Sequence, residues 1–228
     1  KKEKPQIVID VGTNGEVVIG NRYGFLSASC AAGGAYEGAT VKSGTGAIEG
    51  AIKNIRIKDR IVEYETISEK SPIGICGSGL IDLLAELRKN NIIDRRGKFT
   101  NSHKEFFIDK DRDISITQED VNQLMLARAG LSLDQKSLMR YYQTSVDEIE
   151  NIYLAGGFGH YIDANNAIAI GLLPDSKEKV IKIGNGALAG ARQMLLSQEK
   201  RQDSEDILKE IKHCKPNEEE GFFDAFVE

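Results

Sequence analysis

The fold of this chain is decided by one segment near its start, residues 7–19, with the sequence IVIDVGTNGEVVI. Two runs of strand-forming residues flank the turn Gly12–Gly15, and Asn-Gly between such runs is typical of a tight β-hairpin. Residues 23–28 can supply a third strand. A Rossmann dinucleotide site is excluded, because that site needs a helix directly after the glycine turn and a different glycine spacing.

The rest of the chain first forms another hairpin and then alternates helices with strands. Residues 51–57 and 60–67 alternate apolar and polar side chains, which predicts a hairpin with one solvated face. Thr117 is expected to begin a helix, with Asp120 placed to complete a capping box. The other expected elements are an edge strand within 106–113, strands over 149–155 and 180–183, and helices from Leu80 and over 164–170, 186–196 and 203–213. We expect an α/β chain with a mixed sheet of about five strands and helices on its faces.

Composition excludes several classes of function. The 228 residues carry a net charge of −5, and nucleic acid as a partner requires a basic face. No apolar run is long enough to cross a bilayer, and the start of the chain has no signal region, so we expect a cytoplasmic protein without a membrane partner. Cys30, Cys76 and Cys214 are far apart and odd in number. They form no disulfide framework and hold no iron–sulfur cluster alone.

Asp10 and the turn after it are the first candidate site. A carboxylate at a strand end beside glycine amides suits a magnesium–phosphate group: the amides cradle phosphate oxygens and Asp10 holds the cation directly or through water. Gly12 lets the backbone approach a ligand, and Thr13 offers a hydroxyl group. The alternative is a tight hairpin whose aspartate caps its own turn.

Three further glycine motifs carry alternative readings. Residues 154–159, Leu-Ala-Gly-Gly-Phe-Gly, end a strand, where paired glycines let a base or ribose lie against the backbone or let a helix pack closely. Gly77, Ser78 and Gly79 open a helix whose free amides favour an anion, or they form a helix entry that touches no ligand. Residues 184–191 place small side chains on a helix, which favours close packing.

The order of these motifs resembles the second lobe of the superfamily that joins actin, heat-shock chaperones, and sugar and acetate kinases. A closer resemblance, to the reductive activators of corrinoid proteins, covers almost the entire chain. Seven blocks occur in that family's order: 9–16, 28–33, 37–39, 74–82, 154–159, 170–174 and 184–185. Gly34 stands where the family usually has proline.

The resemblance implies a ribonuclease-H-like lobe, residues 1–228, of an actin-like ATPase that binds ATP and Mg²⁺. It implies ATP-dependent reduction of a Co(II) corrinoid protein to Co(I), with electrons from a 2Fe–2S cluster in an N-terminal domain that this chain lacks, together with the first lobe. The site residues that it implies are Asp10 for the metal, Glu16 for orienting water, Gly12, Thr13, Asn14 and Gly15 for phosphates, and Gly156, Gly157, Phe158 and Gly159 for adenosine. Gly77, Ser78 and Gly79 remain candidates for an anion on the evidence of their own motif.

Two rival functions stay open. One is a non-catalytic lobe that docks a corrinoid protein or forms a homodimer, and the other is a lobe of a small-molecule kinase. No second Asp-x-Gly-Thr turn stands before Asp10 to serve as a first phosphate motif. Because phosphoryl transfer needs groups on both sides of the γ-phosphate, we expect the chain alone to be inactive.

Overall fold

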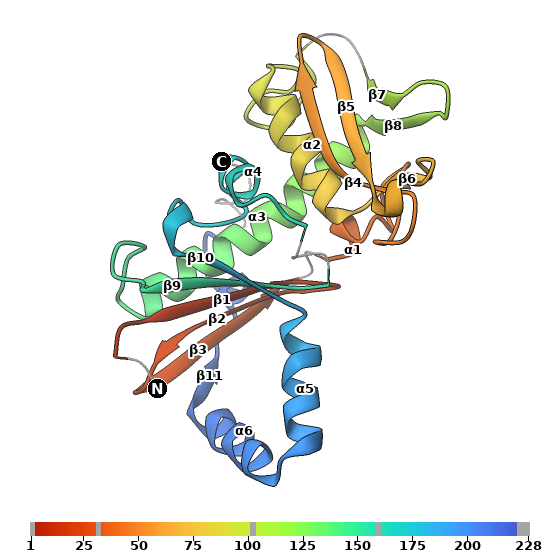
Figure 1. The fold of residues 1–228 in the computed structure, drawn as a ribbon. Coiled ribbons are helices and arrows are strands. Elements are labelled where there is room, and N and C mark those ends of the chain that lie inside the picture. Colours follow the sequence, from red (N-terminus) through yellow and green to blue (C-terminus); the bar gives the residue numbers. More distant parts are fainter. Residues whose placement is uncertain (1–2, 31–32, 101–103, 158–160, 223–228) are drawn as a thin grey trace.

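Within residues 3–30, 33–100, 104–157 and 161–222, which the computed structural model describes, the main sheet has six strands in the order β10-β9-β1-β2-β3-β11 (Figure 1). Its strands are β1 (Gln6–Val11), β2 (Gly15–Asn21), β3 (Gly24–Cys30), β9 (Asn151–Ala155), β10 (Val180–Gly184) and β11 (Ile211–His213). The first three strands pair antiparallel, β9 lies parallel to β1, and β10 lies parallel to β9. The predicted hairpin and mixed sheet are confirmed.

One face of this sheet is covered by the long helix α3 (Gln118–Tyr141), which contacts β2 and β3. Side chains alternate between the faces of a strand, and Ile7, Ile9 and Val17 are fully buried as part of the main core. The capping box predicted for α3 is present: Thr117 accepts from the backbone N–H of Asp120, and the Asp120 carboxylate accepts from that of Thr117.

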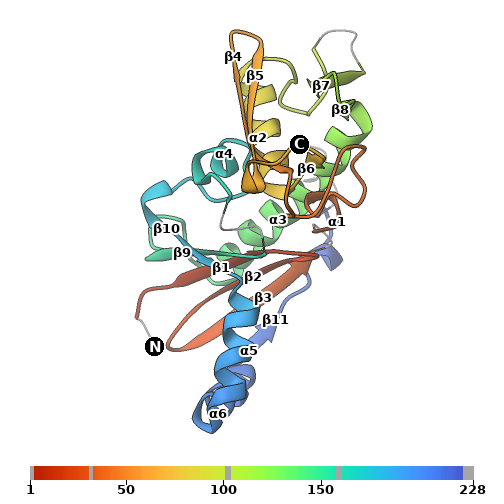
Figure 2. The same ribbon diagram turned by 45° about the vertical axis from the view of Figure 1, so that its right-hand side comes forward.

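A second, smaller part of the chain lies beyond one edge of the main sheet, and α3 runs between the two parts (Figures 1 and 2). Its elements are α1 (Gly33–Tyr36), β4 (Ala51–Lys58), β5 (Ile61–Thr66), β6 (Gly74–Ile75), α2 (Gly77–Lys89), β7 (Glu105–Asp109) and β8 (Ile114–Thr117). The predicted β4–β5 hairpin is confirmed, and α2 packs on β4. The edge strand expected in 106–113 is β7, and its partner β8 was not expected.

The helices α4 (Ala164–Ala169), α5 (Gly186–Leu196) and α6 (Gln198–Glu210) complete the chain with three short 3₁₀ helices, Ile67–Glu69, Lys177–Lys179 and Pro216–Glu218. The prediction of one helix over 203–213 was wrong at both ends. The helix begins at Gln198, and residues 211–213 form β11, which pairs with β3 in parallel. Three residues are too few to show the alternation of a strand, so the sequence prediction extended the helix over them.

The helices α5 and α6 project from the sheet on the side opposite to α3 (Figures 1 and 2). They contact each other, yet neither contains a buried residue. Leu188, Leu195, Leu196 and Leu208 are each exposed by 65% or more. In the part of the chain that the structure describes, no helix has the length and apolar character needed to span a membrane.

Candidate functional site

The β1–β2 hairpin places two carboxylates side by side at one edge of the main sheet. Asp10 on β1 and Glu16 on β2 are direct cross-strand partners. Ile9 and Val17 are buried on the face that α3 covers. Because successive side chains point to opposite faces, Asp10 and Glu16 lie on the other face, next to each other.

No basic side chain among the described residues neutralises the charges of Asp10 and Glu16. Burial raises the pKa of Asp10, and both burial and the neighbouring Asp10 charge raise the pKa of Glu16. Within the described ranges, no salt bridge joins either carboxylate to a basic side chain. The repulsion between two adjacent carboxylates is reduced when one of them binds a proton or when both approach a cation. Oxygen ligands of this kind suit Mg²⁺, which usually keeps several waters and takes few protein ligands.

The turn between β1 and β2 is exposed at Thr13 and Asn14, and it is held by one contact within the turn and one outside it. The Gly12 N–H donates to the carbonyl of Asn14 at 3.0 Å. The Thr13 hydroxyl donates to Oε1 of Glu37 at 2.6 Å, so one predicted phosphate ligand is tied to α1's end. Sequence reasoning did not single out Glu37, although its Glu-Gly-Ala block was one of the seven family blocks.

The end of β9 reaches the same edge, because Asp10 pairs with Ala155 in parallel register. Gly156 follows with φ +125°, and a Cβ there would overlap the carbonyl oxygen of Val11. Glycine is therefore required by the backbone at this position. A Cβ on Gly157 would meet nothing within 4 Å, so this residue borders open space. Phe158 and Gly159 lie outside the described residues.

The start of α5 completes this edge. Gly156 N–H donates to the carbonyl of Gly184 at 3.0 Å, and the side chain of Asn185 caps α5 by accepting from the N–H of Leu188 at 2.8 Å. A Cβ on Gly186 would contact Ala155 at 3.4 Å. The small residues of 184–191 thus begin where β1 and β9 end, and the site is built from three segments that are far apart in sequence.

The Gly77-Ser78-Gly79 motif lies apart from that edge, in the packing of α2 on β4. All three residues are buried, and a Cβ on Gly79 would overlap the carbonyl oxygen of Ile52. The Ser78 hydroxyl donates to the carbonyl of Lys53 at 2.8 Å. Packing therefore accounts for the motif, and its anion-binding role stays a prediction.

Ser78 belongs to a stripe of polar side chains that recurs every four residues along α2. The strand β4 pairs with β6 only at Ala51 and Ile52, which leaves the rest of that edge without a strand partner. The stripe supplies the missing hydrogen-bond partners. Ser78 donates to the Lys53 carbonyl (2.8 Å), and Asn90 donates to the Ile57 carbonyl (3.2 Å). Asp82 accepts from the Ile55 N–H (3.3 Å), and Glu86 accepts from the Ile57 N–H (2.8 Å). Since buried backbone groups need partners, this stripe is structural.

A metal site made of protein ligands alone is not formed by the described residues. Within them, no group of three or more His, Cys, Asp or Glu side chains is arranged to hold a metal ion. Among the described residues, no disulfide joins Cys30, Cys76 or Cys214. A cation at Asp10 would therefore take its remaining ligands from phosphate and water.

Three features are those of an actin-like ATPase domain: the strand order of the main sheet, the carboxylate hairpin, and the glycine turn that ends β9 beside it. The family described as the C-terminal domain of RACo, the ASKHA domain, matches residues 4–228. The chain belongs to this family. The resemblance seen in the sequence and the predicted fold class are thereby confirmed.

Two characterised relatives and one solved structure agree with this assignment. The corrinoid activation enzyme RamQ of Eubacterium limosum is 35% identical over 87% of this chain and 38% of its own length. The Co(II) methylated amine-specific corrinoid protein reductase of Methanosarcina barkeri is 29% identical over 91% of this chain and 42% of its own. A reductive activator for corrinoid, iron–sulfur protein superimposes with a TM-score of 0.91 at 35% identity, over 99% of this chain and 39% of that one. The chain thus spans about two-fifths of the length of these relatives.

Proposed function

We propose that this chain is the nucleotide-binding C-terminal lobe of an activator that uses ATP to reduce a Co(II) corrinoid protein to Co(I). The family assignment and the relatives named for corrinoid activation and reduction support the proposal. The observation that carries it is the pair Asp10 and Glu16, two adjacent carboxylates at the sheet edge where β1 and β9 end, which form no salt bridge with any described basic side chain.

Asp10 would hold Mg²⁺, directly or through water. The Gly12–Gly15 turn would contact phosphate oxygens with the Asn14 side chain and with amides other than that of Gly12, which donates to the Asn14 carbonyl. The Thr13 hydroxyl would join them on leaving Glu37. When bound, the cation supplies charge neutralisation to the phosphates. Glu16 is the candidate for orienting the attacking water. The open backbone at Gly157 and the tight turn at Gly156 support an adenosine contact, and the same role for Phe158 and Gly159 stays a prediction.

The electron would come from a 2Fe–2S cluster held elsewhere, since Cys30, Cys76 and Cys214 are far apart in sequence and, within the described residues, form no cluster-binding group. Nucleotide binding would supply energy by favouring one arrangement of the lobes over another, and so changing how the activator fits the corrinoid protein. In this mechanism, the lobe contributes binding and positioning, and it carries no redox group of its own.

The proposal is tested with the protein at its natural length, a reductant and a corrinoid protein under anaerobic conditions. Absorbance should report conversion of Co(II) to Co(I) only when ATP and Mg²⁺ are both present. Asp10→Asn should abolish this ATP-dependent reduction. Reduction at the same rate without ATP, or an Asp10→Asn variant with full activity, would contradict the proposal.

A docking or dimerisation lobe is a second candidate function, favoured by the exposed leucines of α5 and α6. Apolar surface of this kind commonly marks a protein interface. Light scattering of the purified chain separates the readings: a dimer that is lost in the double variant Leu195→Glu with Leu196→Glu supports self-association. A monomer at every concentration excludes it.

A further inference from the structure

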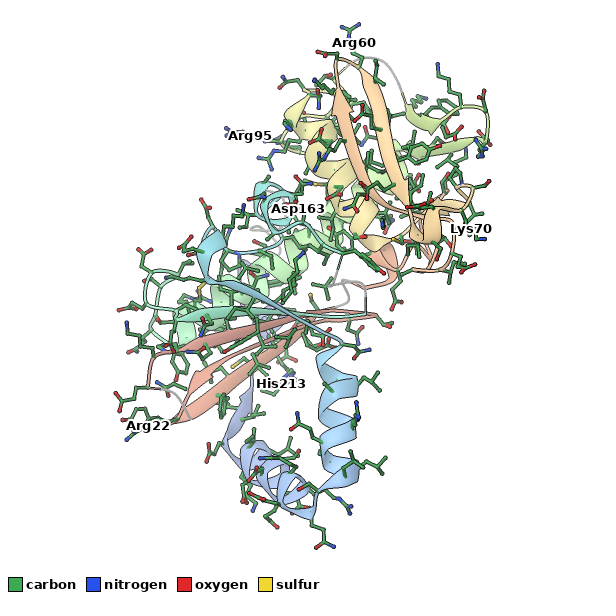
Figure 3. The ribbon with its side chains drawn as sticks, in the orientation of Figure 1. Arg22, Arg60, Lys70, Arg95, Asp163 and His213 are labelled. Carbon is green, nitrogen blue, oxygen red and sulfur yellow. The ribbon has the colours of Figure 1, made fainter. Side chains whose placement is uncertain are left out.

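The hydrogen bond between Thr13 and Glu37 joins the two parts of the chain at the candidate phosphate turn. Thr13 belongs to the turn between β1 and β2 of the main sheet, and its hydroxyl donates to Oε1 of Glu37 at 2.6 Å. Glu37 directly follows α1, in the smaller part of the chain. Figure 3 shows both parts with their side chains, with Arg22 on the main sheet and Arg60 at the far end of the smaller part. The bond therefore links the turn directly to the smaller part.

The backbone on both sides of Glu37 is held in place. Tyr36, the last residue of α1, is fully buried, and its hydroxyl donates to the carbonyl of Leu124 on α3 at 3.1 Å. Gly38 has φ +78°, and a Cβ there would lie 2.4 Å from the backbone nitrogen of Thr45, so this close approach requires glycine. Glu37 itself is exposed. An anchored backbone therefore presents an exposed carboxylate to the turn.

The Thr13 hydroxyl has only one proton to donate. While that proton is donated to Glu37, the hydroxyl oxygen can only accept further hydrogen bonds. The oxygens of a phosphate group are acceptors, so they need a donor. Thr13 can therefore donate to Glu37 or to a phosphate oxygen, but not to both.

Glu37 is not arranged to act with the Asp10–Glu16 pair on a cation. Among the described residues, no group of three acidic side chains is arranged to hold a metal ion. Burial raises the pKa of Asp10, and burial together with the Asp10 charge raises the pKa of Glu16, without a contribution from Glu37. Within the part of the chain that the structure describes, the hydrogen-bond partner of Glu37 is Thr13. Competition for the Thr13 hydroxyl is the role that these contacts support.

We propose that Glu37 sets the affinity of the site for the phosphate half of the nucleotide by competing for the Thr13 hydroxyl, an inference that rests on the proposed function. Before phosphate binds, the bond holds the turn to the end of α1. When phosphate binds, Thr13 donates to a phosphate oxygen instead, and the turn is released from Glu37. Breaking the bond lowers the affinity for phosphate, and it couples binding at the main sheet to the smaller part of the chain.

The experiment measures the binding of magnesium tripolyphosphate by titration calorimetry on the protein at its natural length. Glu37→Ala removes the competing acceptor, so it should tighten binding about fivefold, the size expected for one exposed hydrogen bond to a charged group. Glu37→Gln keeps an acceptor for Thr13 and removes only the charge, so it should tighten binding less than about twofold.

A double-mutant cycle with Thr13 tests whether the effect passes through the hydroxyl. Thr13→Val keeps the branched shape of the side chain and removes the hydroxyl group. In that background, Glu37→Ala should change the affinity for tripolyphosphate less than about twofold. The matched control is Glu49→Ala, which removes an exposed carboxylate from the loop between α1 and β4 and should also change the affinity less than about twofold.

Weaker or unchanged tripolyphosphate binding in Glu37→Ala overturns the inference, because Glu37 would then assist the phosphate contact or take no part in it. Equal tightening in the Thr13→Val background, or by Glu37→Gln, overturns it as well, because the effect would then be charge repulsion alone. Thermal unfolding of each variant, measured in parallel, establishes that the affinities belong to folded protein. Failure of the wild-type protein to bind either MgATP or magnesium tripolyphosphate overturns the proposed function itself, and this result is recognisable before any variant is made.

Discussion

Two pairs of carboxylates in this chain have opposite surroundings. Asp82 and Glu86, four residues apart on α2, are buried, and backbone N–H groups of β4 donate to both. Asp10 and Glu16 are cross-strand neighbours, and within the described residues no hydrogen bond or salt bridge from another residue's side chain reaches them. Burial raises the pKa of Asp82 as it does that of Asp10.

We expect this difference to separate structural carboxylates from ligand-binding ones. Hydrogen bonds from Asn166, Asn54 and the Ile55 N–H lower the pKa of Asp82 and so offset part of its burial. Asp10 has no such compensation, and its neighbour Glu16 adds repulsion. A carboxylate that the fold has already satisfied stabilises the fold, whereas one left unsatisfied at an open edge is available to a cation. The predictions below test this contrast.

The largest expected effect is on the rate of ATP hydrolysis when the Asp10–Glu16 pair is present without the rest of the natural-length protein. The isolated chain should release phosphate from ATP only at background rate, at least about a thousandfold slower than the natural-length protein, because in the proposed site the hairpin would contact the phosphates from one side only. A steady-state phosphate assay on both proteins checks this. Comparable turnover by the isolated chain would mean that these 228 residues contain a complete active site.

Removing a satisfied carboxylate should cost far more stability than removing an unsatisfied one. Asp82→Ala leaves one buried donor and two half-buried donors without their acceptor, which should lower the free energy of unfolding by about 3 to 5 kcal/mol. Asp10→Ala should change it by less than about 1 kcal/mol. Urea unfolding measures both, and an equal cost for the two variants would favour a structural, turn-capping Asp10.

Asp134 is a third case: its carboxylate is buried, as those of the α2 pair are, but one of its oxygens has no described partner. It is 2% exposed on α3, and among the described residues its Oδ2 has no hydrogen-bond partner. Burial raises its pKa from 3.8 to about 6, although a hydrogen bond from Cys30 and the charge of His213 act in the opposite direction. The folded protein thus binds this proton more tightly than the unfolded chain.

The stability that Asp134 contributes is therefore fully present below about pH 4 and is lost as the pH rises through about 6. The loss is on the order of 3 kcal/mol for a shift of this size. Asp134→Asn should raise the free energy of unfolding at pH 8 and flatten its dependence between pH 4 and 6. An unchanged pH dependence in the variant would assign the effect to another group.

The sequence predicts a contact when the residues that form it are close together in the chain. The β1–β2 hairpin and the Thr117 capping box follow from neighbouring residues, and both are confirmed. The α2 stripe was missed, although polar residues at four-residue spacing in an otherwise apolar helix are a usable signal. Its meaning depends on β4 lacking a strand partner beyond Ile52, which is a tertiary fact.

The same limit applies to the candidate site. The parallel register that brings Ala155 beside Asp10 joins residues far apart in sequence, and only the order of motifs suggested it. The Thr13–Glu37 bond and the strand β11 depend equally on tertiary contacts. Local signals therefore identified the individual motifs, and the structure showed which of them meet.

The smallest effect is expected at Gly157, the open side of the strand end. A Cβ there meets nothing within 4 Å, so Gly157→Ala should leave the melting temperature unchanged. If adenosine lies against this backbone, the added methyl group should weaken ATP binding about tenfold and leave tripolyphosphate binding unchanged. Unchanged ATP affinity would place the nucleoside elsewhere.

The most direct test of the contrast between the two pairs is the magnesium dependence of ATP binding in Asp10→Asn, with Glu86→Gln as the control. Calorimetry with Mg²⁺ and with a chelator gives the ratio of the two affinities for each protein. Wild type and Glu86→Gln should bind at least about tenfold more tightly with Mg²⁺, and Asp10→Asn should show less than about a twofold difference while keeping its melting temperature. An Asp10→Asn variant that retains the full magnesium dependence, or that loses stability as much as binding, would contradict the account.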